Sequence, residues 1–310
     1  MIQRIDPEVP GRFGNLEFLA RQVVEGFITG MHKSPFHGFS VEFAEHRIYN
    51  PGDTTRHIDW KLYGRTEKLF VKRFEEETNL RCQLVIDNSS SMRFGASGSK
   101  KQAHSKITFS IECAAALAYL LRKQRDAVGL SVMSDHMELH TAAKSSSTHH
   151  KMLFTQLDKL YHPPEGINGK RTNTAELLHL LADKIHKRSL VVIFSDMLDN
   201  TASAEPLFSA LQHLKHNKHE VILFHVLEKE LEMAFSYQNR PYRFVDMETG
   251  HIVRANPAEL REQYVEKMSH YYKQLRLKCL QYKIDFVPAY INEGFEKVLL
   301  SFLVKRAKLH

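Results

Sequence analysis

Polar residues follow an apolar run in "LVIDNSSSMRFG", residues 84–95. Asp87 ends the run, and Ser89 and Ser91 follow at alternate positions. Three kinds of chemistry are compatible with this spacing: a polar loop that caps a helix, a carboxylate beside a nucleophilic serine, or three oxygen ligands for a metal ion. Because Asp and Ser are favoured in turns and caps in any case, the loop alone does not decide between them.

Two further oxygen-bearing residues follow later in the chain. Asp196 ends another apolar run, "VVIFSD", and Thr172 lies in "GKRTNTAE", just before a predicted helix. In an open α/β sheet, ligands gather at the carboxyl ends of the strands, so both residues can join the loop after Asp87. A set of hard oxygen ligands with partial negative charge suits Mg²⁺ or Mn²⁺ better than zinc. This combination favours a metal site.

The elements that must position these residues alternate regularly. Continuous apolar runs predict buried strands, and runs with 3.6-residue periodicity predict helices between them. Such alternation indicates an α/β fold with a doubly wound, mostly parallel sheet. The expected strands are 82–87, 127–134, 137–143, 189–196 and 219–227, and the expected helices are 106–125, 148–160, 173–187 and 204–217.

The flanking segments differ from this pattern. Residues 1–80 are expected to form an N-terminal α+β extension, with a helix at 15–31 and short strands at 39–43 and 68–74. Residues 81–310 form the main domain, with a hairpin insertion near 228–256 that turns at Glu248-Thr249-Gly250. A long helix at 257–282, a strand at 283–290 and a closing helix at 294–308 complete the prediction.

The segment "YNPGDTTRHIDWK" contains the only tryptophan of the chain among several charges. Its residues could form a recognition surface, or a salt-bridged plug that holds the N-terminal arm against the sheet. We favour the plug, because a lone tryptophan among paired charges is usually packed. The residues concerned are Arg47, Asp53, Arg56, Asp59 and Trp60.

Composition indicates a soluble, cytoplasmic protein. Of 310 residues, 43% are apolar, enough for a core, and no apolar run approaches the roughly 20 residues that span a bilayer. The N-terminus lacks the apolar segment of a signal peptide. Three cysteines without CxxC spacing point to reduced thiols rather than disulfides. The net charge of +7 permits an acidic partner, nucleic acid or an anionic membrane surface, and proves none of them.

Two rival functions find less support. A hydrolase needs a base near its nucleophile, but no Gly-x-Ser-x-Gly elbow is present, and "DNSSS" lacks the Asp-x-Asp pair of a metal-dependent phosphatase. "GASGSKK" does not have the spacing of a phosphate-binding loop. The basic residues are spread over predicted helices without a nucleic-acid recognition motif, so solvated surface explains them better. We therefore expect neither an enzyme nor a nucleic-acid-binding protein.

The Asp-x-Ser-x-Ser loop, "RTNTAE" and "FSD" together resemble the metal-ion-dependent adhesion site of von Willebrand factor A domains. That resemblance implies a Mg²⁺ (or Mn²⁺) held by Asp87, Ser89, Ser91, Thr172 and Asp196, with one coordination position left for a carboxylate of a binding partner. "EFAEHRIYNPGDTTRHIDWKLYGRTEKLFVKRFEEE", "SMRFG", "FSDMLD", "HEVILFHV" and "DMETG" are similar to the signature of the bacterial DUF58 family, in the same order. Thr54 replaces a usual acidic residue, and Arg171 a usual glycine, but no proposed ligand is lost.

The family resemblance also implies partners. Members are similar to proteins encoded beside MoxR-type AAA+ ATPases, which are thought to act with them in maturing or assembling other proteins. Many relatives carry membrane helices ahead of the shared region, whereas no such span is expected in this chain. We therefore predict a metal-dependent protein-binding module that captures an acidic residue of such an ATPase or of its client.

Overall fold

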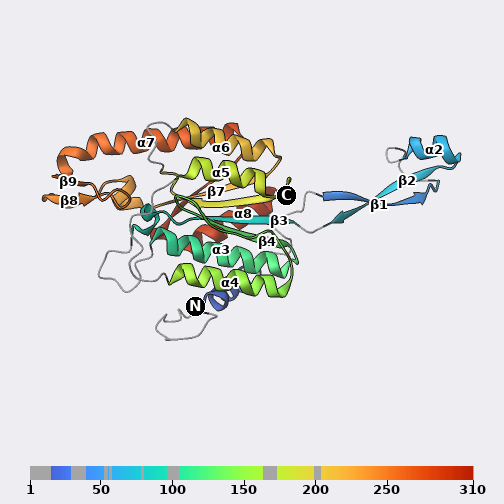
Figure 1. Ribbon diagram of the computed structural model, residues 1–310, viewed down its shortest axis with the longest axis horizontal. Helices are drawn as coiled ribbons and strands as arrows, with labels where there is room; N and C mark the ends of the chain where they lie inside the picture. The colour runs from blue at the N-terminus through green and yellow to red at the C-terminus, as the bar shows by residue number, and fades with distance from the viewer. Residues whose placement is uncertain are drawn as a thin grey trace. The chain divides into compact units, whose positions relative to one another are not determined.

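The computed structural model describes residues 15–28, 40–51, 55, 58–77, 80–95, 105–162, 173–198 and 204–309 (Figure 1). The chain divides into two compact units. The large unit contains residues 1–35 and 81–310, and the small unit contains residues 36–80. The expected extension over residues 1–80 is therefore split, because the helix α1 (Asn15–Ile28) packs against α3 (Lys106–Lys123) and belongs to the large unit.

A six-stranded sheet forms the centre of the large unit. Its strand order is β10-β7-β6-β3-β4-β5, and each pair is parallel except β4 with β5. This confirms the expected α/β fold with a mostly parallel sheet. The strands are β3 (Arg81–Asp87), β4 (Ala127–Met133), β5 (Met137–His140), β6 (Leu190–Ser195), β7 (Glu220–Leu227) and β10 (Asp285–Tyr290).

Helices cover both faces of this sheet, which explains why every residue of β6 and every residue of β3 after Arg81 is buried. On one face lie α5 (Thr174–Lys184), α6 (Glu205–His216) and α7 (Pro257–Gln281); on the other lie α3 and α8 (Phe295–Leu309) (Figure 1). The helix α4 (Ser147–Tyr161) packs beside α3. Among the described residues, no helix is long and apolar enough to cross a membrane.

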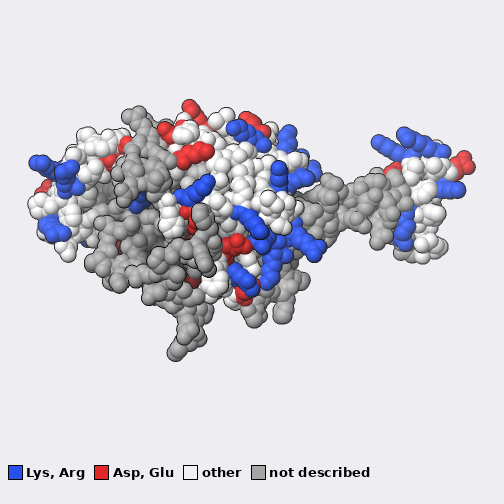
Figure 2. All heavy atoms as spheres, turned by 60° about the horizontal axis from the view of Figure 1, so that its bottom comes forward, with Lys and Arg blue, Asp and Glu red and all other residues white. Residues whose placement is uncertain are grey.

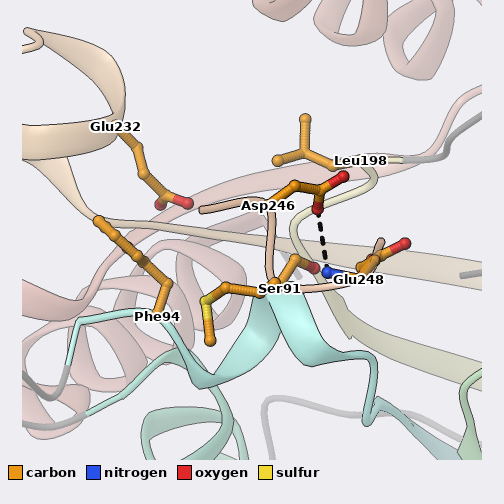
Figure 3. Close-up of a pocket in the computed structure, with 7 residues that line it drawn as sticks. Ser91, Phe94, Leu198, Glu232, Asp246 and Glu248 are labelled. Atoms are coloured by element: carbon orange, nitrogen blue, oxygen red, sulfur yellow. Dashed lines mark hydrogen bonds between the residues drawn. The ribbon is translucent and has the colours of Figure 1, made fainter. Parts of the chain in front are cut away.

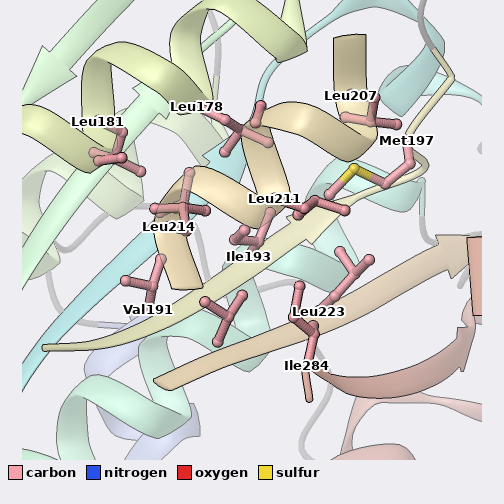
Figure 4. Packing of buried hydrophobic residues seen from close by; sticks show 14 of the residues in the cluster. Leu178, Leu181, Val191, Ile193, Met197, Leu207, Leu211, Leu214, Leu223 and Ile284 are labelled. Carbon is pink, nitrogen blue, oxygen red and sulfur yellow. The ribbon is translucent and has the colours of Figure 1, made fainter. Parts of the chain in front are cut away.

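Alternate residues of each central strand supply the two halves of the core. Val191 and Ile193 of β6 face the α5–α6–α7 side, where they pack with leucines of those helices (Figure 4). Phe194, one position on, stacks on Phe224 of β7 with ring centroids 4.9 Å apart, and Phe302 of α8 packs edge-on against Phe224. This two-residue period fixes the register of the strands and therefore the positions of their ends.

The insertion between β7 and β10 forms a hairpin, as expected. It consists of β8 (Tyr242–Val245) and β9 (Ile252–Ala255), which pair antiparallel. Gly250 in the turn has φ +72°, a conformation that glycine adopts without steric cost. A π-helical turn, Lys229–Met233, lies between β7 and the hairpin and was not predicted from the sequence. Phe235 after this turn packs on Phe244 of β8 and Tyr264 of α7.

The small unit is an antiparallel ribbon with a short helix at one end. The strand β1 (Ser40–Ile48) pairs with β2 (Phe70–Glu77), and α2 (Trp60–Thr66) lies in the connection between them. Asp59 caps α2 by accepting from the backbone amides of Lys61 and Leu62. Trp60 is 63% exposed, so the small unit itself does not pack around this side chain as a buried tryptophan would require. Asp53 and Arg56 lie outside the described residues.

Candidate metal centre

The candidate site forms where β3 and β6 end side by side. These strands pair in parallel with Ile86 opposite Phe194, so the residues that follow them emerge at the same edge of the sheet. The Ser195 hydroxyl donates a hydrogen bond of 2.6 Å to Oδ2 of Asp87. Strand register therefore brings together two segments that are more than a hundred residues apart in the sequence.

The loop after Asp87 folds back on that carboxylate. The backbone amide of Ser89 donates to Oδ1 of Asp87 at 3.0 Å, and a short 3-10 helix, Ser90–Arg93, follows. The hydroxyls of Ser89 and Ser91 lie 3.1 Å apart. The Asp-x-Ser-x-Ser spacing thus gathers one carboxylate and two hydroxyls at the edge of the sheet, as expected for alternate positions of a bent loop.

Asn88 ties this loop to its neighbours. Its backbone amide donates to the carbonyl of Met133 at the end of β4, and its side-chain amide donates to Glu138 of β5 at 3.0 Å. Arg93 returns a hydrogen bond of 3.2 Å to the Asn88 side-chain oxygen. These contacts hold the loop between β3 and α3 at the end of the sheet.

Asp196 is fully buried and is held by two donors. Its Oδ1 accepts from the backbone amide of Leu198 at 3.1 Å, and its Oδ2 accepts from Nζ of Lys106 at 2.7 Å. Thr172, the remaining residue of the expected ligand set, lies outside the described residues. Four of the five expected ligands can therefore be placed, and all four lie at the ends of β3 and β6.

The two aspartates repel one another. Burial, and next the negative charge of Asp196, raise the pKa of Asp87 to about 6, against the lowering effect of the hydrogen bonds from Ser195 and Ser89. A nearby cation stabilises the ionised form of a carboxyl group in such a position. The electrostatics of the site therefore favour a positively charged ligand.

Lys106 supplies one such cation from within the chain, and sequence reasoning missed it. It is the first residue of α3, and its side chain is fully buried, with Nζ 2.7 Å from Asp196 and 2.5 Å from Glu232. Burial disfavours its charged form, but the two carboxylates outweigh that effect and raise the pKa of Lys106 above its usual value. A lysine at the start of the mostly apolar helix "KITFSIECAAALAYLL" was the available signal, but no spacing rule links it to Asp196.

A pocket of about 240 Å³ opens beside these residues (Figure 3). Ser91 lies on its floor, and the turn of the β8–β9 hairpin contributes a wall through Asp246 and Glu248, linked by a hydrogen bond of 2.9 Å from the Glu248 amide to Oδ1 of Asp246. Burial raises the pKa of Glu232, which also lines the pocket. The full lining is Ser91, Phe94, Leu198, Glu232, Asp246, Met247 and Glu248.

The described residues fit a hard divalent cation. Within the described ranges, no group of three or more His, Cys, Asp or Glu side chains is arranged as a metal site. The candidate set instead combines two carboxylates with serine hydroxyls, which are oxygen ligands of the kind that Mg²⁺ and Mn²⁺ accept. After burial, the negative charge of Asp196 is the next cause of the raised pKa of Asp87, and a cation between the two strand ends would relieve that repulsion.

A nucleophilic serine finds no base here. In the described part of the chain, neither Ser89 nor Ser91 forms a hydrogen bond to a histidine; the serines bond to each other. His225, the buried histidine beside the site, contacts the backbone carbonyl of Asp196 through Nε2 at 2.9 Å. Burial lowers the pKa of His225 to about 4, so it is neutral at physiological pH.

Comparison with known proteins gives distant relatives. Uncharacterized proteins of Mycobacterium bovis and Mycobacterium tuberculosis are 25% identical over 223 residues, which is 72% of this chain. The match spans 66% of those proteins, just under two thirds of their length.

Similar solved structures share 14% sequence identity with the chain. One is an aerotolerance-related membrane protein from Bacteroides fragilis, with a TM-score of 0.41 over 75% of this chain and 100% of that chain. Another is the SpRpn10 VWA domain, with a TM-score of 0.35 over 48% of this chain and 76% of that chain. This comparison contradicts the expected cytoplasmic location, because the Bacteroides protein is named as a membrane protein. We therefore do not retain the cytoplasmic location.

One family model matches the chain, and its description is "Protein of unknown function DUF58". The match runs over residues 45–273, well over half of the sequence. It includes the small unit from β1 onward, both strand ends of the candidate site and the β8–β9 hairpin. The large unit has the α/β fold with a mostly parallel sheet that the sequence predicts, and the chain belongs to the DUF58 family.

Proposed function

We propose that this chain is a metal-dependent protein-binding module. The support for protein binding is the resemblance of the sequence motifs to the metal-ion-dependent adhesion site of von Willebrand factor A domains. The gathering of Asp87, Ser89 and Ser91 at a strand end next to the buried Asp196 is the observation that carries the metal dependence. The residues that would hold Mg²⁺ or Mn²⁺ are Asp87, Ser89, Ser91, Thr172 and Asp196. A divalent cation bound there supplies an open coordination position for a carboxylate oxygen of the partner.

The acidic side chains around the pocket make this binding conditional on the metal. Glu232, Asp246 and Glu248 line the pocket, and among its lining residues there is no Lys or Arg. Without a divalent cation, a partner carboxylate that enters the pocket meets negative charges that the single ammonium of Lys106 does not balance. The same charges attract the cation, so they favour capture of the partner only after the metal has bound.

The remaining lining residues can contact the partner around its carboxylate. Phe94, Leu198 and Met247 give the pocket apolar walls, which bury apolar surface of a partner segment. Ser195 and the Ser89 amide hold Asp87, and Lys106 holds Asp196, so both carboxylates keep their positions before the partner arrives. Preorganisation of this kind lowers the entropic cost of binding.

The partner that we propose is a MoxR-type AAA+ ATPase or its client protein, bound through an acidic residue during protein maturation or complex assembly. The support for this partner is the family resemblance of the sequence. The support for an acidic contact is the oxygen-lined site, where a carboxylate can complete the coordination of a divalent cation.

Calorimetric titration with Mg²⁺ and Mn²⁺ tests the site, with Asp87→Ala as the variant. We expect the native chain to bind one ion and the variant to bind none, while both keep the same circular dichroism. The matched control is Asp135→Ala, which removes an exposed carboxylate from the loop after β4. Unchanged metal binding in Asp87→Ala would show that the site assignment is wrong.

A pull-down from native extract tests the partner. The native chain should capture a protein with Mg²⁺ and lose it on chelation, and Asp87→Ala should capture nothing under either condition. The captured protein is then identified by mass spectrometry, and substitution of its exposed Asp and Glu residues locates the contact. Equal capture with and without the metal would exclude a metal-dependent mode of binding.

A further inference from the structure

The helix α2 of the small unit presents large apolar side chains to solvent. Trp60 and Tyr63 are three positions apart on one helix face, and they are 63% and 41% exposed. Ile48, which ends β1 and pairs with Phe70 of β2, is also 63% exposed. Large apolar groups gathered on an exposed surface mark an interaction site more often than a solvated face.

Cations lie on the other side of the same helix. At 100° per residue, Lys61 and Arg65 fall on the helix face that is turned away from Trp60 and Tyr63, and Lys68 follows the end of the helix. Within the described residues, none of the three cations forms an ion pair. The nearest acidic residues are Asp59, whose carboxylate caps α2, and Glu67, which ends it. Figure 2 shows Lys and Arg atoms over the described surface of the small unit.

The position of α2 places this surface at one end of the small unit. Because Ile48 pairs with Phe70 and the connection between them contains α2, the helix lies at the closed end of the β1–β2 ribbon (Figure 1). We call Ile48, Trp60, Lys61, Tyr63, Arg65 and Lys68 the α2 tip. Its aromatic rings are edge-to-face, with an interplanar angle of 84° and centroids 6.2 Å apart.

This chemistry favours one occupant. Tryptophan and tyrosine on one face of a helix prefer the boundary between headgroups and hydrocarbon, and lysine and arginine on its polar face contact anionic lipid headgroups. Stacking of nucleic-acid bases, the other use of aromatic and basic residues together, needs open ring faces, and an edge-to-face pair covers part of them. We propose that the α2 tip docks on an anionic lipid surface, as a peripheral contact that needs no membrane-spanning helix and is separate from the metal site.

The single tryptophan makes the test direct. Because Trp60 is the only tryptophan of the chain, its fluorescence reports on the α2 tip alone. The full chain is mixed with vesicles of phosphatidylcholine, or of equal parts phosphatidylcholine and phosphatidylglycerol. We expect a blue shift and protection from acrylamide quenching with the anionic vesicles only, reversed by added salt.

Charge variants separate docking from a structural effect. Replacing Lys61 and Arg65 with Gln keeps the reporter and should weaken partition about 10- to 30-fold, since each cation near an anionic surface contributes about 1 kcal/mol. The matched control replaces Lys151 and Lys159, two exposed cations of α4, with Gln and should bind like the native chain. Circular dichroism and unchanged Trp60 fluorescence without lipid establish that the variants fold.

Four outcomes would overturn the proposal. The first is no blue shift with anionic vesicles, and the second is equal partition of the two double variants. The third is a blue shift that depends on protein concentration without lipid, which would assign the tip to a second copy of the chain. The fourth is a blue shift with a single-stranded oligonucleotide or an acidic protein but not with vesicles. None of these results depends on Mg²⁺, so the test is independent of the metal site.

Discussion

At the scale of single residues, Lys106 adds a positive charge to the candidate site. Its buried ammonium contacts Asp196 and Glu232, so the site contains a permanent cation beside the carboxylates proposed to hold a metal. A buried ion pair adds little stability over an apolar replacement, but removal of one partner leaves an uncompensated charge. Lys106 therefore lets the site stay folded before a metal binds.

Substitution of Lys106 tests this role. Lys106→Met leaves Asp196 and Glu232 buried without their common partner, and we expect a loss of about 3 kcal/mol or more in the free energy of unfolding without metal. Mg²⁺ should restore more stability to this variant than to the native chain, as measured by thermal unfolding with and without the ion. The double variant Lys106→Met/Glu232→Gln should lose less than the single variant. A single variant with native stability would show that the ion pair is not needed.

The pKa of Asp87 gives a pH dependence. Its folded value of about 6 lies above the usual value of 3.8, so between these values the folded state binds more protons than the unfolded state. Stability therefore falls as the pH rises from about 4 to 6, by about 3 kcal/mol in total at 1.36 kcal/mol per pH unit. Metal binding requires the ionised carboxylate, so Mg²⁺ affinity should fall as the pH is lowered from 7 to 5.

Asp87→Asn separates these two effects. It removes the like charge beside Asp196, so at pH 7 this variant should be more stable than the native chain in urea unfolding and yet bind no Mg²⁺ in calorimetry. The difference in stability should disappear near pH 4, where the native carboxyl is protonated. A variant that is less stable than the native chain at pH 7 would contradict the raised pKa.

At the scale of elements, strand ends were predictable and long-range side-chain partners were not. The continuous apolar runs before Asp87 and Asp196 predict β3 and β6, and parallel pairing then places both carboxylates at one edge. Lys106 could not be linked to Asp196 because a buried ion pair across 90 residues follows from packing, which leaves no periodic signal. For the same reason the sequence predicted the β8–β9 hairpin but not its place in the wall of the pocket.

In the small unit, the sequence did not predict the exposure of a large aromatic side chain. Charges around Trp60 suggested a packed plug, but α2 leaves that side chain exposed. Composition does not distinguish a tryptophan that fills a core from one that faces a partner, since both environments bury the ring in the complete assembly. The sequence also gave no sign of α2, because a seven-residue helix is too short to show periodicity.

The hairpin turn offers a test at this scale. Asp246 accepts hydrogen bonds from the Glu248 amide and the Thr249 hydroxyl, so Asp246→Ala loosens a wall of the pocket without touching a proposed metal ligand. We expect partner capture to weaken about 5- to 10-fold, at roughly 1 kcal/mol for a lost hydrogen bond, while one Mg²⁺ ion still binds. Partner capture by Asp246→Asn, which keeps an acceptor oxygen, should be intermediate between that of the native chain and that of Asp246→Ala. Loss of metal binding in Asp246→Ala would place the hairpin in the metal centre itself.

At the scale of the whole molecule, two compact units carry two separate proposals. The large unit contains the sheet, the core cluster and every described residue of the candidate metal centre, whereas the small unit contains the α2 tip. The core cluster draws on β3, β6, β7, α5, α6 and α7, all of which lie after residue 80. The stability of the large unit should therefore depend little on the small one.

Excision tests this separation of roles. When residues 36–80 are replaced by a Gly-Ser linker, the remaining chain keeps its own core, so it should unfold cooperatively and bind Mg²⁺ with native affinity. Its affinity for anionic vesicles should fall to that of the variant without Lys61 and Arg65, measured by sedimentation because Trp60 is gone. Native vesicle binding would place the lipid contact in the large unit. Loss of Mg²⁺ binding would show that the small unit takes part in the metal centre, because the large unit otherwise contains all of its described residues.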